Sequence, residues 1–160
     1  MFKDNLFHIK QISFKEILPI WQDKLWPNRA SQIETHSAMT WPPSYPNQPY
    51  NMQVFDYPVY FYGAFINDNL IGVNSGHLTN NTEFRSRGLW VEKTYRGMGI
   101  GKRLLLVTVE QARISNANMI WSLPRTSSLY SYKSVGFIEV GSVIDHNVEF
   151  GPNIYCCLQL

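Results

Sequence analysis

The sequence lacks the features that mark several classes of protein. Its 160 residues include only two cysteines, Cys156 and Cys157, which are adjacent and so cannot form an ordinary disulfide across the fold. No second pair of cysteine or histidine residues completes a zinc site, and no apolar run reaches the roughly 18 residues of a membrane span. The N-terminal segment has no apolar signal-peptide core. We therefore expect a cytoplasmic protein that binds neither a metal nor a membrane.

Charge is also scarce. Charged residues make up 16% of the chain and the formal net charge is +2. A balance this mild argues against a nucleic-acid partner. The length suits a single domain over residues 1–160, because domains usually have roughly 100–200 residues. The oligomeric state is open, with a homodimer among the options.

Aromatic residues are abundant, at 14% of the chain, and rings in this number must fill a core or line a pocket. The hydrophobic periodicity of the sequence predicts a mixture of helices and strands. A helix with a Ser13–Glu16 capping box is expected to kink or end early at Pro19, and Ser31–Glu34 suggests a second short helix. Proline-rich residues 41–58 are expected to form an ordered loop. Further strands are predicted over residues 5–12, 59–66, 70–78, 84–92, 119–123, 137–143 and 154–160, with helices from residue 99 to 116 and over 126–135.

Three glycines precede the longest predicted helix. Gly97, Gly99 and Gly101 let a ligand approach the backbone closely, and a helix N-terminus favours an anion. This pattern indicates a phosphate or pyrophosphate site. A P-loop is excluded because Arg96 and Arg103 stand where it needs glycine and serine or threonine, and the spacing of a dinucleotide-binding fingerprint also fails.

Two motifs together resemble one family. Arg96-x-x-Gly99-x-Gly101 is similar to the pyrophosphate-loop signature of the GNAT N-acetyltransferase superfamily, and residues 129–137, Leu-Tyr-Ser-Tyr-Lys-Ser-Val-Gly-Phe, resemble its tyrosine helix. The resemblance implies an α/β (α+β) fold with a single central sheet, mixed but mostly antiparallel. This sheet would splay in the middle and be flanked by about four helices.

The resemblance also implies a chemistry. An amine of the acceptor would attack the thioester of acetyl-CoA directly, the backbone amide of Val91 would stabilise the oxyanion, and Tyr132 would protonate the departing thiolate. The pantetheine arm would pair with the strand before the glycine loop like an added strand. The implied acetyl-CoA contacts are Leu89, Trp90, Val91, Arg96, Gly97, Met98, Gly99, Ile100, Gly101 and Lys102.

The sequence departs from the family pattern at several positions. Arg85 stands where several members carry a carboxylate base, so Glu83 is the first candidate for that role, with His77 and Glu92 as the others. Arg85 and Arg87 fall on one strand face, either toward a carboxylate of the acceptor or at a solvated edge. Two further departures, Arg125 and Ser128, precede the tyrosine helix.

The acceptor would be a small-molecule or peptide amine. Because the acetyl-CoA groove needs few rings, we predict that the early aromatic residues wall the acceptor pocket and favour an acceptor with an apolar part. A non-catalytic acetyl-CoA sensor is the main alternative, and a nucleic-acid-binding aromatic domain is a weaker one. The rings concerned are Trp21, Trp26, Trp41, Tyr45, Tyr50, Phe55 and Tyr57.

Overall fold

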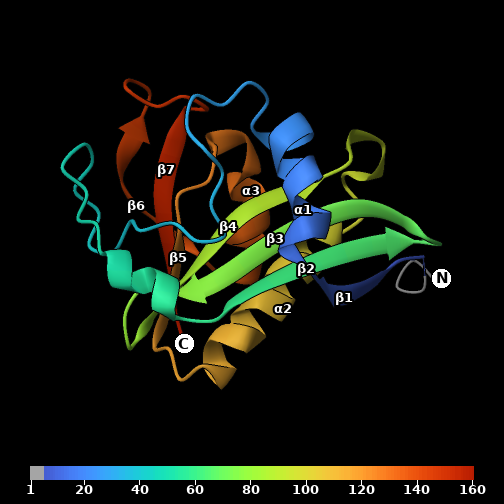
Figure 1. Cartoon of the computed structure of the whole chain (residues 1–160), viewed down its shortest axis with the longest axis horizontal. Helices are drawn as coiled ribbons and strands as arrows, with labels where there is room; N and C mark the ends of the chain where they lie inside the picture. Colours follow the sequence, from blue (N-terminus) through green and yellow to red (C-terminus); the bar gives the residue numbers. More distant parts are fainter. Residues whose placement is uncertain (1–5) are drawn as a thin grey trace.

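The computed structural model describes residues 6–160 and contains a seven-stranded sheet (Figure 1). The strand order is β1-β2-β3-β4-β5-β7-β6, and every neighbouring pair is antiparallel except β4 and β5. This confirms the expected mixed, mostly antiparallel sheet. The strands are β1 (His8–Ile12), β2 (Val59–Ile66), β3 (Asn69–Leu78), β4 (Glu83–Val91), β5 (Met119–Ser122), β6 (Ile138–Ile144) and β7 (Asn153–Gln159).

Helices cover both faces of the sheet. The helix α1 (Phe14–Ile20) lies on one face, and α2 (Ile100–Ile114) and α3 (Leu129–Val135) lie on the other (Figure 1). Within residues 6–160 there are three α-helices, one fewer than the four or so expected. None of these described helices is long and apolar enough to cross a membrane.

The first helix begins as the sequence predicts. Ser13 and Glu16 form the capping box, in which each side chain accepts from the other's backbone N–H. The α-helix ends at Ile20, one residue after Pro19, as expected. The chain continues through a π-helical turn, η2 (Trp21–Leu25), which the Trp26 N–H closes by donating to the Trp21 carbonyl.

The predicted helix at Ser31–Glu34 is wrong. Residues 31–34 are not helical, and tertiary contacts hold the segment instead. The Arg87 guanidinium donates to the Glu34 carbonyl at 3.0 Å, which draws this stretch onto the sheet.

The sheet splays between β4 and β5, as expected. These strands pair over only three residues, from Glu83 opposite Met119 to Arg85 opposite Trp121. Immediately beyond them, the Ser122 hydroxyl donates to the Ser86 carbonyl at 2.7 Å. β5 ends at Ser122, whereas β4 continues to Val91. Residues 87–91 therefore pair with β3 on one side but have no strand on the side of β5.

A bulge bends β4 along this open edge. Val73 faces Trp90 and Ser75 faces Arg87, so Asn74 lies opposite two residues, of which one is Gly88. Gly88 has a φ of +80°, a conformation that favours glycine. Its carbonyl accepts the indole N–H of Trp21 at 2.9 Å, which ties the bulge to the first helical segment.

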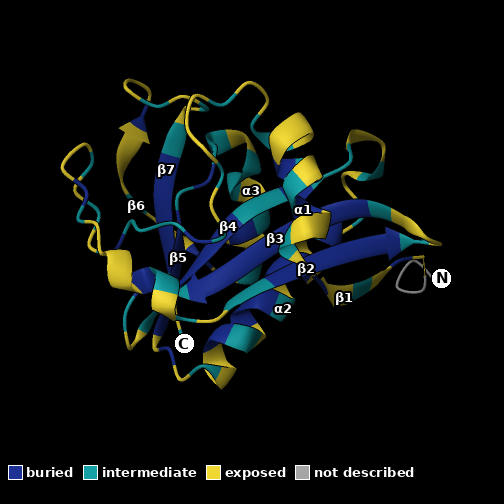
Figure 2. Cartoon of the chain, in the orientation of Figure 1, coloured by how far each residue is buried: buried dark blue, intermediate teal, exposed yellow. Residues whose placement is uncertain are grey.

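Figure 2 shows the central strands buried along most of their length, whereas β6 at the sheet edge is largely exposed. The segment between η2 and β2 covers the face on which α1 lies. In it, the Trp41 ring packs against Trp121 in a tilted arrangement and against Tyr155 edge to face. A short 3₁₀ turn, η3 (Met52–Asp56), ends the cover before β2.

Candidate active site

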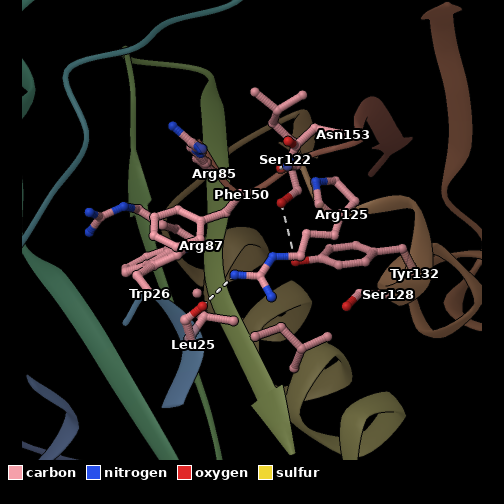
Figure 3. A pocket seen from close by; sticks show the side chains of 14 residues that line it. Leu25, Trp26, Arg85, Arg87, Ser122, Arg125, Ser128, Tyr132, Phe150 and Asn153 are labelled. Carbon is pink, nitrogen blue, oxygen red and sulfur yellow. Dashed lines mark hydrogen bonds between the residues drawn. The ribbon is translucent and has the colours of Figure 1, made fainter. Parts of the chain in front are cut away.

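A pocket opens where β4 and β5 diverge (Figure 3). The open edge of β4 forms one wall, and the ends of β5 and α3 form the opposite wall. Leu25 and Trp26 close one side and Phe150 closes another. The lining residues that bear polar or reactive side chains are Arg85, Arg87, Ser122, Arg125, Ser128, Tyr132 and Asn153.

Tyr132 reaches this pocket from α3. Its side chain is only 1% exposed, and its hydroxyl lies 3.1 Å from the hydroxyls of both Ser86 and Ser122. The single hydroxyl proton of Ser122 can be donated to the Ser86 carbonyl, at 2.7 Å, or to the Tyr132 hydroxyl. The phenol is therefore held at the point where the two strands separate.

Burial raises the pKa of Tyr132 to about 12, with a smaller contribution from Cys156, while the hydrogen bonds to Ser122 and Ser86 and the charge of Arg85 act in the opposite direction. The phenol therefore remains protonated at neutral pH. It is available as a proton donor to a base that forms in the pocket.

A buried polar network supports Ser86 from behind. The Asn74 amide donates to the Ser86 hydroxyl at 3.0 Å and to the Thr108 hydroxyl at 2.9 Å, and Thr108 donates to the Leu104 carbonyl in α2. These groups are fully buried and satisfied. They fix the hydroxyl that faces Tyr132.

The pocket continues as a groove along the open edge of β4. A second hollow shares Leu25, Leu89, Arg125 and Ser128 with the first, and a third shares Val91, Arg96, Tyr130 and Ser131 with the second. The groove thus runs from Tyr132 to the glycine loop. Of the predicted acetyl-CoA contacts, it is lined by Leu89, Trp90, Val91, Arg96, Gly97, Gly99, Ile100, Gly101 and Lys102, whereas Met98 packs against the core.

The glycine loop is open toward the groove. Gly97 and Gly99 have φ values of +83° and +82°, and a Cβ on either would meet nothing within 4 Å. A Cβ on Gly101 would approach the Ser131 hydroxyl to 3.1 Å, so this glycine lets α3 lie close to α2. The first backbone bond of α2 runs from the Arg103 N–H to the Gly99 carbonyl, and among the described residues no side chain caps this end. The preceding amides are therefore available to an anion.

The amide of Val91 points toward the groove. The next amide, that of Glu92, donates to Ile71 in β3 at 2.8 Å. Successive amides of a strand point to opposite sides, so the Val91 N–H lies on the β5 side. Arg96 donates from Nε to the Val91 carbonyl at 2.9 Å and fixes the end of the strand.

Arg85 and Arg87 are both buried on the face of the sheet that carries α1. Arg85 donates to the Ser37 hydroxyl at 2.7 Å and lies over the Trp121 ring, while Arg87 lies over Trp21 and also over Trp26. Burial is the main cause that lowers the pKa of Arg85 to about 10 and that of Arg87 to about 9. Both groups remain charged at neutral pH. Because both are buried, neither is at a solvated edge.

The structure separates the candidate bases from the pocket. Glu83 begins β4 at its opposite end and accepts from Asn80, eight residues before Val91. Glu92 accepts from the Lys93 N–H outside the groove, and His77 is fully buried beneath the covering segment. None of the three lines the pocket, so Glu83 is not placed to act as a base there.

The aromatic residues predicted to wall an acceptor pocket divide into groups. Trp26 lines the pocket, Trp21 supports Arg87 from below, and Phe55 lines a neighbouring hollow that also includes Arg87. The prediction is wrong for the others. Trp41 and Tyr45 pack over β5 and β7, Tyr50 is exposed, and Tyr57 donates to Asn81.

Sequence reasoning missed several residues of the site. Ser86 and Ser122 are isolated serines within strands and belong to no pattern that signals a function, whereas Ser131 lies within the tyrosine-helix motif but is not among the predicted site residues. Cys156 and Cys157 are free and buried, and burial raises the pKa of both thiols. Within residues 6–160, no group of three or more histidine, cysteine or acidic side chains could hold a metal.

Comparison with known proteins places this geometry in context. The model of the acetyltransferase (GNAT) family matches residues 22–137. None of the curated proteins compared with the chain matches it.

Solved structures share the fold. An acetyltransferase of the GNAT family from Staphylococcus aureus Mu50 superposes with a TM-score of 0.63 at 16% identity, over 96% of this chain and 98% of its own. An aminoglycoside 6'-N-acetyltransferase complexed with coenzyme A gives 0.56 at 16% identity, over 67% of this chain and 76% of its own. A Bacillus subtilis acetyltransferase in complex with CoA gives 0.52 at 20% identity, over 70% and 94%.

Proposed function

Since the chain belongs to the acetyltransferase (GNAT) family, we propose that it transfers an acetyl group from acetyl-CoA to a primary amine by direct attack. The observation that carries this proposal is the continuous groove along the open edge of β4, with a glycine loop at one end and Tyr132 at the other. Two structures of the same fold are CoA complexes, which supports the choice of co-substrate.

The residues present fit acetyl-CoA. Gly97 and Gly99 leave space beside amides that have no partner in α2, which suits a pyrophosphate, and Lys102 adds a positive charge there. The unpaired backbone of residues 89–91 suits the amide groups of a pantetheine arm. The thioester end would then lie beside Tyr132, in the pocket that Gly88 and Leu89 also line.

In the transfer, the lone pair of the acceptor nitrogen forms the new N–C bond while the C–S bond breaks and leaves its electron pair on sulfur. A backbone N–H at the open edge of β4 beside the pocket stabilises the negative charge that develops on the carbonyl oxygen. Val91 lies one hollow further along, so its N–H suits the pantetheine arm instead. Tyr132 donates its proton to the thiolate, and the proton lost by nitrogen passes to water, from which the tyrosinate recovers its own. A phenol can do this because the burial that raises its pKa also raises that of the thiol.

No aspartate, glutamate or histidine is among the residues that line the pocket. The cationic side chains instead favour the reactive form of the acceptor. Arg85, Arg87 and Arg125 all line the pocket, and nearby positive charge lowers the pKa of an ammonium group. More of the bound acceptor is then the neutral amine, which reduces the need for a general base.

Two measurements test the proposal. Calorimetry with CoA should show binding to the folded protein, and a panel of primary amines with acetyl-CoA should release free thiol together with acetylated product detected by mass spectrometry. The absence of an acidic side chain from the pocket favours one alternative, a non-catalytic acetyl-CoA sensor. Binding without any product would support the sensor, and a folded protein that fails to bind CoA would overturn both.

A further inference from the structure

The pocket beside Tyr132 is strongly cationic. Three of its lining side chains are guanidinium groups, those of Arg85, Arg87 and Arg125, and none is an aspartate or glutamate. In Figure 3, Arg85 and Arg87 lie across the pocket from Tyr132. Positive charge therefore lines the pocket that Tyr132 enters.

Two of these charges are buried without a counter-ion. Arg85 is 8% exposed and Arg87 is 6% exposed, and neither forms an ion pair with any described residue between 6 and 160. Burying an unpaired charge is costly, and the aromatic rings beside these two offset only part of that cost. An anionic ligand would remove the imbalance.

The hydrogen-bond capacity of the two guanidinium groups is also largely unused. Each has five N–H donors, yet Arg85 donates only to Ser37 and Arg87 only to the backbone of Glu34. The Nε of Arg85 is buried and has no partner among the described residues. Planar forks with free donors match the two oxygens of a carboxylate.

On the basis of the proposed function, we propose that the acceptor is an amine that also carries a carboxylate, an amino acid or a molecule of that class. Its carboxylate binds between Arg85 and Arg87, and its amine points across the pocket toward Tyr132. Arg87 also lines the neighbouring open hollow, where Phe55 and Met52 lie beside polar side chains such as Arg29 and Glu34, so a longer side chain of the acceptor would extend there.

Matched pairs of acceptors test this inference on the unmodified protein. Each pair shares its amine and carbon skeleton and differs in the carboxylate: L-phenylalanine with 2-phenylethylamine, and 4-aminobutanoate with propylamine. L-Phenylalaninamide separates the effect of charge from that of amine pKa. We expect kcat/KM for thiol release to favour the carboxylate member by roughly 30-fold or more.

The Arg87→Gln variant should reduce this preference toward unity, because turnover of the carboxylate member of each pair falls much more than turnover of its partner. The affinity for CoA should stay nearly unchanged. The matched control is Arg113→Gln, which removes an exposed arginine from α2 and should keep the full preference. Circular dichroism establishes that each variant is folded. If Arg87→Gln does not fold, the acceptor pairs measured on the unmodified protein still show whether a carboxylate is preferred.

Equal or faster turnover of the amines that lack a carboxylate would overturn the inference and leave the proposed N-acetyltransferase intact. An undiminished preference in a folded Arg87→Gln variant would also overturn it, because Arg87 would then only anchor the covering segment at Glu34. Failure of every amine, with or without a carboxylate, to release thiol would instead reject the proposed function itself.

Discussion

The buried hydroxyl of Tyr132 can act as a proton donor only toward a base that forms in the pocket during the reaction. The phenol is shielded from solvent and touches Ser86 and Ser122, which are themselves fixed by other hydrogen bonds. Without the phenol hydroxyl, Ser122 would keep its bond to the Ser86 carbonyl and Ser86 its bond from Asn74, so the groove should stay intact. Its effect should therefore be confined to the reaction.

We expect Tyr132→Phe to lower kcat by about 100-fold, the scale of general acid catalysis, and to leave the Kd for CoA nearly unchanged. Thiol-release kinetics and calorimetry measure the two quantities. Tyr57→Phe is a matched control, because it removes a hydroxyl that contacts Asn81 away from the groove. Unchanged turnover in Tyr132→Phe would show that Tyr132 is not the acid.

Sequence patterns located the two ends of the site but not its base. Tyr132 and the glycines belong to motifs that fix a local backbone, and local backbone is what sequence specifies best. Glu83 was chosen by proximity along the chain. A strand advances about 3.3 Å per residue, so Glu83, eight positions before Val91, lies roughly 26 Å from it. Ser86 and Ser122 come together because β4 and β5 are paired up to the preceding residues. No local sequence pattern signals this pairing of distant segments.

At the scale of elements, Gly88 connects the bulge of β4 to the first helical segment. A Cβ at this position would lie 2.4 Å from the indole nitrogen of Trp21 and 2.5 Å from two ring carbons. The indole is fully buried and cannot move aside without repacking. The Trp21 ring also packs against Trp26, which lines the pocket.

The Gly88→Ala variant should lose about 3 kcal/mol of unfolding free energy, through overpacking added to the cost of a positive φ. Gly97→Ala is the matched control: its φ is almost the same, yet a Cβ there meets nothing within 4 Å, so it should lose only about 1 kcal/mol. Urea denaturation measures both. Equal losses would mean that backbone strain, not the contact with Trp21, dominates at Gly88.

Elements whose ends are set by local chemistry agree with the sequence prediction, and those held by distant contacts do not. The capping box at Ser13 starts α1 as expected. The same spacing at Ser31 and Glu34 does not start a helix, because Arg87 from β4 binds the carbonyl of Glu34. That bond joins residues 53 positions apart and could not be inferred from either segment alone.

For the whole molecule, a histidine joins the covering segment to the sheet. His77 is fully buried in β3, where its Nδ1 contacts the Leu78 carbonyl and its Nε2 accepts the Ser37 N–H. The His36 ring, from the covering segment, lies 4.9 Å from it. Protonation of His77 would remove the acceptor for Ser37 and place a charge beside Arg85 and Arg87.

The stability of the protein should therefore fall in acid. Burial lowers the pKa of His77 well below its usual 6.5, with the charges of His36, Arg87 and Arg85 adding to the effect and the Leu78 carbonyl opposing it; burial also lowers the pKa of His36. A pKa that is lower in the folded state gives stability that is complete above pH 6.5. Below that value the unfolded chain takes up protons first, so stability declines as pH falls.

Each such histidine adds up to about 1.4 kcal/mol per pH unit to the slope of the unfolding free energy against pH. Urea denaturation of the unmodified protein at a series of pH values below 6.5 measures the slope. His77→Gln retains an oxygen that can accept the Ser37 N–H but cannot be protonated in this range, so its slope should be shallower by the share that His77 contributes. His146→Gln, at an exposed position, should leave the slope unchanged. If His77→Gln keeps the full slope, the link between this histidine and the covering segment does not govern acid stability.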